Sequence, residues 1–295
     1  MRLVAVVLSY NGREDTLAAL ASLRGIETVV VDNGSSDGSA DAVAERFPEV
    51  ELVRTGVNLG FSGGNNVGIR RALDRGAGWV LLVNNDAEAE PGLVEALGAA
   101  AASRPDAGVL ACKILDAGSD RLWYAGAGFD ARLGRSRHEG FGRPDEPGGA
   151  LRDTVRDTVR DTVRATGTGM AVSRAAIEVA GLLDEELFLY AEDLEWSLRI
   201  RAAGFAVVYV PEARIRHRVS ASSGGAGSPT TAYYETRNML AVVERHRPLP
   251  RGLTGARRAL VVAPRVLQSA RRPASAWAAV RGWRDYRRGR MGRRG

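Results

Sequence analysis

Three short segments combine carboxylates and amides in patterns that could bind a cation or move a proton. They are Asp32, Asn84–Asp86 and Glu192–Asp193, and the first two directly follow apolar runs. Carboxylate and amide oxygens suit a hard divalent cation, and a carboxylate can act as a general base. Taken singly, each segment also fits an ordinary turn or an acidic first turn of a helix. Their joint occurrence at the strand ends of one sheet would indicate a functional site.

Alternating strand-like and helix-like segments over the first 115 residues predict the sheet that would position these groups. Short runs rich in Val and Leu, which suit strands covered on both faces, occur at residues 3–9, 28–32, 50–54, 79–86 and 108–115. Helices are predicted between them at residues 14–23, 39–47, 65–75 and 91–103. Asn11 can cap the first helix, and Pro91 suits the first turn of the fourth. This order predicts an α/β domain with a mostly parallel sheet and a ligand site at the carboxyl ends of its strands.

The pattern is looser after residue 115. Gly-rich, hairpin-like sequence extends to about Gly149. The threefold RDTV repeat at residues 152–164 indicates a local duplication in a loop, and its last copy leads into a strand that ends at residues 166–170. The elements predicted beyond it are a helix at 193–203, strands at 205–211 and 213–218, a loop at 220–228, and helices from residue 229 with breaks near Pro248, Pro264 and Pro273.

The composition of the 295-residue chain narrows the class of protein. Hydrophobic residues make up 45% of it, which is too many for a disordered chain and enough for a sizeable core. Cys112 is the only cysteine, so a disulfide framework and a cysteine metal cluster are excluded. No apolar run approaches the roughly 18 residues of a membrane-spanning helix, and the first residues lack a signal-peptide pattern. We therefore expect a cytoplasmic protein.

Positive charge is concentrated near the C-terminal end. Residues 251–295 hold 13 arginines and one acid, a charge of +12, so the first 250 residues carry −6 of the total of +6. The same segment has Trp277, Val280, Trp283 and Tyr286 at intervals of three residues, which suits a helix at an anionic membrane surface. Packing of this helix on the body of the protein or on a second subunit is the alternative. No nucleic-acid-binding module accompanies the arginines, so no nucleic acid partner is expected.

Six motifs occur in an order typical of one family. They are VLSYNG (residues 7–12), VDNGSSDGS (31–39), NLGFSGGNNVG (58–68), LLVNNDA (81–87), GLLDEELFLYAEDLEWSLR (181–199) and YYETRN (233–238). Together they resemble family 2 glycosyltransferases of the rhamnosyltransferase-like kind, over about residues 1–240. The resemblance implies a glycosyltransferase A-type (GT-A) fold over residues 1–245, with a nucleotide-binding half at about 1–115 and an acceptor-side half at about 116–245. An Arg-rich helical tail then covers residues 246–295.

The resemblance also implies a divalent metal, Mn²⁺ or Mg²⁺, at the diphosphate of a nucleotide-sugar donor. The family's Asp-x-Asp-type motif corresponds to Asn84-Asn85-Asp86, with Asp86 as the carboxylate ligand and the two asparagines beside the nucleotide. Asn84 departs from the versions of the motif that have two acids. A downstream histidine completes the metal site in related enzymes, and His217 stands in position for that role. An exposed histidine on a basic strand edge is the alternative.

The nucleotide contacts are implied in the same way. Asp32 would accept a hydrogen bond from the ring N–H of uracil or thymine, and Asn58, Asn65 and Asn66 would line the nucleotide cleft. The segment TGTGM (residues 166–170) would form a backbone wall near the donor sugar or the acceptor. Arg237 would meet the diphosphate, with an ordinary arginine on a helix surface as the alternative.

The Glu192-Asp193 pair resembles the family's ED motif, whose aspartate is the catalytic base. Asp193 is therefore the expected base, with Glu192 beside it. Where the family often continues with Asp-x-Asp, this chain has Glu195, which leaves an acceptor-side role of that residue open. One carboxylate suffices for an inverting transfer, because a single displacement needs no enzyme nucleophile.

The resemblance thus implies an inverting hexosyltransferase in the synthesis of a cell-envelope polysaccharide. The preferred donor is dTDP-L-rhamnose, and the acceptor is a glycan or a lipid-linked glycan at the inner face of the cell membrane, which the tail would contact peripherally. A UDP-sugar donor and a non-catalytic nucleotide-sugar-binding protein of the same fold remain alternatives. The sequence does not indicate an oligomeric state.

Overall fold

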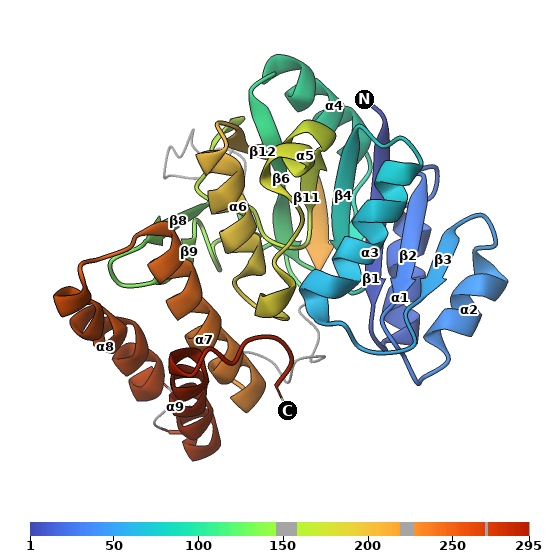
Figure 1. Ribbon diagram of the computed structural model, residues 1–295. Coiled ribbons are helices and arrows are strands. Elements are labelled where there is room, and N and C mark those ends of the chain that lie inside the picture. Colours follow the sequence, from blue (N-terminus) through green and yellow to red (C-terminus); the bar gives the residue numbers. More distant parts are fainter. Residues whose placement is uncertain (146–157, 219–226, 269–270, 295) are drawn as a thin grey trace.

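A mixed sheet forms the centre of the molecule in the computed structural model, which describes residues 1–145, 158–218, 227–268 and 271–294 (Figure 1). The strands are β1 (Leu3–Ser9), β2 (Thr28–Asp32), β3 (Glu51–Arg54), β4 (Trp79–Asn84), β5 (Ala87–Ala89), β6 (Ala107–Asp116), β7 (Leu122–Tyr124), β8 (Ala127–Asp130), β9 (Arg135–His138), β10 (Arg160–Asp161), β11 (Met170–Ser173) and β12 (Ala206–His217). Ten of them form one sheet, with the order β10-β12-β6-β11-β4-β1-β2-β3 and with β5 paired to β12 and β7 to β6. Strands β8 and β9 form a separate hairpin.

Helices flank this sheet, and three more gather beside it near the C-terminal end (Figure 1). The helices are α1 (Arg13–Ser22), α2 (Ser39–Arg46), α3 (Gly60–Asp74), α4 (Leu93–Ser103), α5 (Arg174–Ala180), the 3₁₀ helix η1 (Glu185–Leu187), α6 (Glu192–Ala202), α7 (Pro229–His246), α8 (Arg251–Gln268) and α9 (Pro273–Arg287). Helices α3, α5 and α6 lie in front of the sheet in the view of Figure 1. None of the helices in the described ranges is long and apolar enough to cross a membrane.

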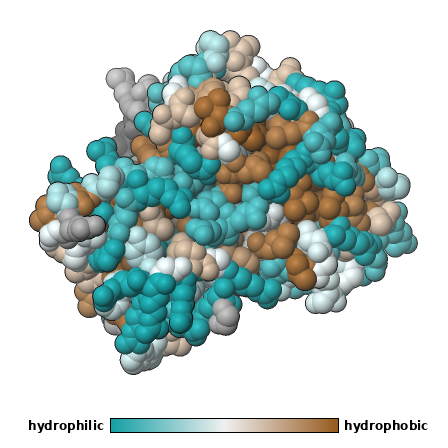
Figure 2. Space-filling model, viewed as in Figure 1, coloured by the Kyte–Doolittle hydropathy of each residue, from teal (hydrophilic) through white to brown (hydrophobic). Residues whose placement is uncertain are grey.

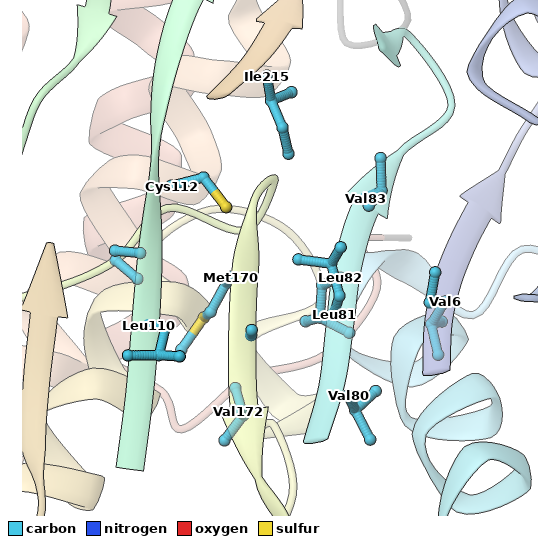
Figure 3. Close-up of a cluster of buried hydrophobic side chains, with 14 of the residues drawn as sticks. Val6, Val80, Leu81, Leu82, Val83, Leu110, Cys112, Met170, Val172 and Ile215 are labelled. Carbon is cyan, nitrogen blue, oxygen red and sulfur yellow. The ribbon is translucent and has the colours of Figure 1, made fainter. Parts of the chain in front are cut away.

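The core lies along the central strands, because their side chains are apolar on both faces of the sheet. Figure 3 shows Leu82 of β4, Leu110 of β6 and Met170 of β11 side by side in this layer. All three side chains are buried. Cys112 lies among them, and burial raises the pKa of its thiol, so the one cysteine is an inert core residue.

The predicted α/β fold is confirmed, but the sheet is mixed rather than mostly parallel. Strands β3, β2, β1 and β4 run parallel, as do β6 and β12. Strand β11 lies between β4 and β6 and is antiparallel to both. The pattern of hydrophobic residues indicates which faces of a strand are buried, and a strand buried on both faces has the same pattern in either direction. The direction of β11 therefore could not be predicted from the sequence.

Most predicted element boundaries are within two residues of the structure. The strand predicted to end at residues 166–170 is wrong, because β11 begins at Met170 and continues to Ser173. Other exceptions have local causes. Helix α3 begins at Gly60 rather than at residue 65, so the glycine-rich segment is helical. Asn11 does not cap α1: the cap position is Gly12, with a left-handed φ of 78°, and the Asn11 amide oxygen accepts from the Ser36 backbone N–H instead. Helix α4 begins at Leu93, beyond Pro91.

Two predicted breaks in the C-terminal half are absent. The strands predicted at 205–211 and 213–218 form one strand, β12, with an irregular register between Val210 and Arg214. Helix α8 continues through Pro264, although helices do break near Pro248 and begin at Pro273 as predicted. Leu260, whose carbonyl loses its usual donor at Pro264, has a half-exposed side chain on the outer side of the helix. Residues 152–157 of the RDTV repeat and most of the 220–228 loop lie outside the described residues.

The arginine-rich segment packs on the rest of the chain through α9. The face that α9 buries consists of small and polar residues, among them Gly282, where an added Cβ would come within 2.4 Å of the Tyr233 carbonyl oxygen of α7. The Tyr233 hydroxyl donates a hydrogen bond to Asp285 at 2.9 Å. Of the aromatic residues predicted to meet a membrane, Trp277 is 67% exposed, whereas Trp283 packs on a buried cluster. Packing on the body, one of the two alternatives, therefore describes α9.

Candidate functional site

The carboxyl ends of β1, β2 and β4 meet at one edge of the sheet, as predicted. Strand β1 pairs with β2 up to Ser9 and Asp32, and with β4 up to Asn84. The Asn85 side chain joins the loops that follow: its Nδ2 donates to the Asn11 carbonyl at 2.8 Å. Asp32 and the Asn84–Asp86 segment therefore belong to one site.

Asp86 and His217, 131 positions apart in sequence, are in contact. Strand β5 directly follows Asp86 and pairs antiparallel with the end of β12, so that Ala87 lies opposite His217. The His217 Nε2 atom lies 3.0 Å from the Asp86 carboxylate, and both side chains are buried. The predicted alternative of an exposed histidine on a strand edge is therefore wrong.

A divalent cation fits this pair as a partial ligand set. Among the described residues no group of three or more His, Cys, Asp and Glu side chains is arranged around one point. The Nδ1 atom of His217 is buried and has no hydrogen-bond partner in the described structure. One carboxylate and one imidazole suit Mn²⁺, and water and donor phosphate oxygens would complete the coordination, as they do for cations that are held at substrate phosphates.

Asn33, which was not among the predicted site residues, joins the end of β2 to the start of α3. Its Nδ2 donates to the Gly60 carbonyl at 3.1 Å, and its Oδ1 accepts from the Leu59 N–H at 2.9 Å. Asn58 also faces this junction, because its Oδ1 accepts from the Gly60 N–H at 2.8 Å. Asp32 beside it is 5% exposed and accepts from the Ser35 N–H at 3.3 Å.

Asn65 and Asn66 brace the fold in this structure instead of lining an open cleft. Each is 1% exposed. Asn65 donates to the Phe61 carbonyl within α3. Asn66 donates to the Leu183 carbonyl at 2.9 Å and accepts from the Leu183 N–H at 3.1 Å. Their amide groups are thus engaged by the protein, and the side chains position α3 and the segment that leads to η1.

Arg237, predicted to meet the diphosphate, is fully buried and bonded to backbone carbonyls. Its guanidinium donates to the carbonyls of Glu186, Leu187 and Gly292 at 2.6–3.1 Å. It also lies over the Tyr234 ring, 4.9 Å from the centroid. The alternative of an exposed helix arginine is equally wrong. Arg237 holds the segment before α6 and the C-terminal residues against α7.

The segment that Arg237 holds is strained, and it leads directly into the predicted base. Phe188, Tyr190 and Ala191 have φ values of 63°, 68° and 68°, which are unfavourable for residues with a side chain. Asn238 stabilises this conformation, because its Nδ2 lies within 2.8 Å of three carbonyls, including that of Tyr190. Helix α6 begins at Glu192, immediately after the strained residues. The RN pair of the YYETRN motif thus positions the acids.

The TGTGM segment connects the predicted metal motif to the predicted base. The Asn84 N–H donates to the Thr168 hydroxyl at 3.1 Å, and the Gly167 N–H donates to the Asp193 carboxylate at 3.1 Å. Asp193 is held further by its interaction with the Arg164 guanidinium at 3.5 Å. Two consecutive residues of TGTGM therefore fix Asp193 relative to Asn84.

The surroundings of Glu192, the first of the two adjacent acids, favour its protonated form. Burial and the charge of Asp193 raise the pKa of Glu192 to about 8, and its Oε2 has no hydrogen-bond partner in the described structure. Glu192 therefore holds a proton at neutral pH.

Glu195 forms ion pairs away from these two acids. Burial would raise the pKa of Glu195, but hydrogen bonds from His246, Arg199 and Arg245 outweigh that effect and lower its pKa to about 2. Glu195 is thus a structural ion-pair residue.

Arg164 and His138 form part of the site without having been predicted. Arg164 Nη2 lies 2.8 Å from His138 Nε2, and His138 Nδ1 lies 3.0 Å from the Trp123 carbonyl. Burial and the Arg164 charge lower the pKa of His138 to about 4. The imidazole is therefore neutral, with its proton on Nδ1 and its Nε2 lone pair toward Arg164. Arg164 belongs to the RDTV repeat, and that low-complexity context concealed it.

A cavity of about 970 Å³ opens beside Asp193. Its walls come from the β8–β9 hairpin, the start of α6, and helices α7 and α8. Trp123 lines it and lies between two histidine rings, 4.7 Å from that of His138 and 5.1 Å from that of His217. Glu192 and Asp193 line the cavity, whereas Asp86 and His217 do not. Trp123 is the lining residue that contacts His217.

Comparisons with known proteins identify the family of the chain. Residues 4–157 match the family model described as glycosyl transferase family 2. The chain is 31% identical over 241 residues to the N-acetylglucosaminyl-diphospho-decaprenol L-rhamnosyltransferase of Mycobacterium tuberculosis, which covers 77% of this chain and 78% of the relative. It is 25% identical over 260 residues to the dTDP-rhamnosyl transferase RfbF of Shigella flexneri, covering 83% and 81% of the two chains.

A solved structure shares the fold. The crystal structure of GalNAc-T7 with UDP, GalNAc and Mn²⁺ matches with a TM-score of 0.62 at 17% sequence identity. The match covers 92% of this chain, which spans 57% of the length of that protein. At this level of identity the likeness concerns the fold alone.

Proposed function

The chain belongs to glycosyl transferase family 2 and has its GT-A fold, and from that premise we propose that it is an inverting, metal-dependent rhamnosyltransferase. Its donor is dTDP-L-rhamnose, and its acceptor is a hydroxyl of a lipid-linked glycan used in cell-envelope polysaccharide synthesis. One observation carries the proposal above the others. The neighbours Thr168 and Gly167 bond to Asn84 and Asp193, respectively, so the donor-side motif and the base occupy one site.

The names of the relatives support rhamnose as the transferred sugar. Both the mycobacterial relative and RfbF are named as rhamnosyltransferases, and RfbF is named with the dTDP nucleotide. Asp32 suits a thymine or a uracil ring equally well, because each ring has an N–H that can donate a hydrogen bond to a carboxylate. A UDP-sugar therefore stands as the second donor to be tested.

Asp86 and His217 would hold the metal, as their 3.0 Å contact and burial support. When bound there, a divalent cation neutralises the charge that develops on the departing diphosphate. Asn84 and Asn85 flank this position at the end of β4, where amide groups suit the phosphate and ribose oxygens of a donor. Asp32, Asn33 and Asn58 border the nucleotide side of the same edge.

Asp193 acts as the general base. Its carboxylate takes the proton of the acceptor hydroxyl while that oxygen attacks the anomeric carbon, and the nucleoside diphosphate departs from the opposite face. A single displacement of this kind inverts the anomeric configuration. The protonated form of Glu192 favours this division of roles, because a carboxyl group that already holds a proton cannot take one from the acceptor hydroxyl.

Contact with an anionic membrane surface fits the outer face of α8 better than the aromatic residues of α9. Exposed apolar residues recur on α8 at intervals of three and four: Leu253, Ala256, Leu260, Ala263 and Leu267. The left edge of the molecule over α8 is accordingly hydrophobic in part, whereas the region over α9 is largely hydrophilic (Figure 2). Peripheral attachment at the inner face of the membrane would bring the enzyme to a lipid-linked acceptor.

Donor binding tests this function directly. Purified protein with Mn²⁺ is titrated with dTDP-L-rhamnose, a UDP-sugar and a GDP-sugar, and the shift in melting temperature is recorded for each. We expect the largest shift with dTDP-L-rhamnose and a smaller one when the metal is chelated. A larger melting shift with the UDP-sugar would identify that sugar nucleotide as the donor instead. Nucleotide binding that does not depend on the metal would contradict the proposed metal site.

A further inference from the structure

Arginines of β9 and α8 line the cavity beside Asp193. Within the described residues, the side chains of Arg135 and Arg137 of β9 form no hydrogen bond or ion pair. Arg265 of α8 donates to the carbonyls of Gly134, the residue directly before β9, at 2.7 Å and of Val261 at 2.6 Å. Among the described residues, none of the three forms an ion pair with a carboxylate.

Arg135 and Arg265 are near enough to repel each other. Burial and the charge of Arg135 lower the pKa of Arg265, against the opposing influence of Glu235 on α7. Burial raises the pKa of Glu235, which weakens it as a counter-ion. An anion beside these arginines would relieve the repulsion.

The remaining acids of the cavity do not supply that anion. Asp130 accepts hydrogen bonds from the backbone N–H groups of Arg132 and Leu133 in the hairpin turn. Glu192 holds a proton at neutral pH, and Asp193 is bonded to Gly167 and Arg164. The positive charge of Arg135, Arg137 and Arg265 therefore remains available to a ligand.

We propose that this cavity binds a glycosyl diphosphate, the charged head of the acceptor, with its phosphates at the guanidinium groups of Arg135, Arg137 and Arg265. The proposal rests on the proposed transferase function and names the acceptor chemistry. Guanidinium groups match phosphate oxygens with paired hydrogen bonds. The volume of about 970 Å³ lies within the range of small-molecule sites.

The sugar of this head would lie at the inner end of the cavity, against Trp123 and close to Asp193. The Trp123 ring offers an apolar face of the kind on which sugars pack, and it stands beside His138 and His217. The phosphates would lie toward Arg265, on the helix whose outer side carries the exposed leucines. A lipid chain attached to the phosphates would then begin next to the proposed membrane-contacting face.

The test compares a charged and an uncharged acceptor with the full chain, Mn²⁺ and the donor. The charged probe is N-acetylglucosaminyl diphosphate with a short alkyl chain, and the uncharged probe is the matching alkyl N-acetylglucosaminide. Arg135→Gln and Arg137→Gln should each raise the KM of the charged probe about tenfold, the effect of losing one charge-assisted hydrogen bond. Neither substitution should change the KM of the uncharged probe or the melting shift that the donor causes.

Arg132→Gln is the matched control, because Arg132 is an exposed arginine of the same hairpin turn that does not line the cavity. Equal KM values of the wild type for the two probes, or Arg135 and Arg137 variants that behave like Arg132→Gln, would overturn the anion site while leaving the transferase function intact.

Equilibrium binding of the charged probe, measured without donor, distinguishes failure of the anion site from failure of the proposed function. If the wild type binds this probe in an Arg135-dependent way but transfers no sugar to either probe, the anion site stands and the proposed function fails. If the probe neither binds nor is glycosylated, the anion site is wrong. Calorimetry on the same preparations supplies this measurement.

Discussion

The backbone N–H of Gly167 donates a hydrogen bond to the Asp193 carboxylate at 3.1 Å, so a segment remote in sequence holds the proposed base. Gly167 precedes β11, whereas Asp193 lies in the first turn of α6. An added Cβ at Gly167 would lie 2.6 Å from the Phe61 ring, so the close approach needs a glycine. The position of Asp193 therefore depends on packing between segments that are remote in sequence.

Asp193→Asn should lower kcat by about 10² to 10⁴-fold, the usual contribution of a general base. The melting shift caused by the donor should stay within experimental error, because donor and metal contact other residues. Asp74→Asn, the same change at an exposed residue at the end of α3, is the control and should leave turnover unchanged. Near-normal turnover of Asp193→Asn would transfer the role of base to another residue.

Glu192→Gln should alter the pH dependence of stability. The pKa of Glu192 is about 8 in the folded chain against 4.5 ordinarily, so the folded state holds an extra proton between those values. Wild-type stability should therefore fall, relative to the variant, as pH rises from about 4.5 to about 8. Thermal unfolding of both proteins from pH 5 to 9 checks this, and parallel curves would contradict the raised pKa.

Asp86→Asn and His217→Ala should each abolish the rise in melting temperature that Mn²⁺ produces together with the nucleotide. The metal interacts with both side chains in the proposed site, and loss of a ligand weakens binding steeply. Transfer should also fall to the level of chelated wild-type enzyme. Wild-type transfer that survives exhaustive chelation would show that the reaction needs no metal.

Arg237→Leu should destabilise the protein by at least about 2 kcal/mol, because buried carbonyls of η1 and of Gly292 lose their donor. Chemical denaturation measures the loss. Under conditions where the variant is folded, its affinity for the donor should equal that of the wild type. A stable variant with weakened donor binding would instead restore Arg237 to the diphosphate.

Leu260→Glu should greatly weaken binding to vesicles that contain anionic lipid, because it places a charge in the exposed apolar row of α8. Leu260 is 52% exposed, so folding should be unaffected. Val179→Glu is the matched control, since Val179 of α5 is 66% exposed outside this row. Wild-type binding should also weaken with salt. Co-sedimentation measures both effects, and equal binding by the two variants would rule out this face.

The amino-acid sequence alone determined the α/β layering and the order of the site segments. Continuous apolar runs identified β1, β2 and β4 almost to the residue, because a strand buried on both faces must be apolar throughout. The polar residues that follow those runs had to meet at one sheet edge. Asp32 and Asp86 could therefore be named in advance as candidate site residues, partly through the resemblance of their motifs to a known family. Asp193 was named through that resemblance alone.

Only the tertiary structure decided what each polar side chain contacts. Arg237, Asn65 and Asn66 were expected at a nucleotide, yet their partners are backbone groups brought close by packing, and no local pattern encodes such partners. Arg164 and His138 escaped notice because a repeat and a hairpin have no sequence signature of a site. The same holds for three further features of the structure: the direction of β11, the burial of Glu192, and the cavity arginines that form no ion pair among the described residues. They depend on which distant segments meet, and that is set by the free energy of the whole folded chain.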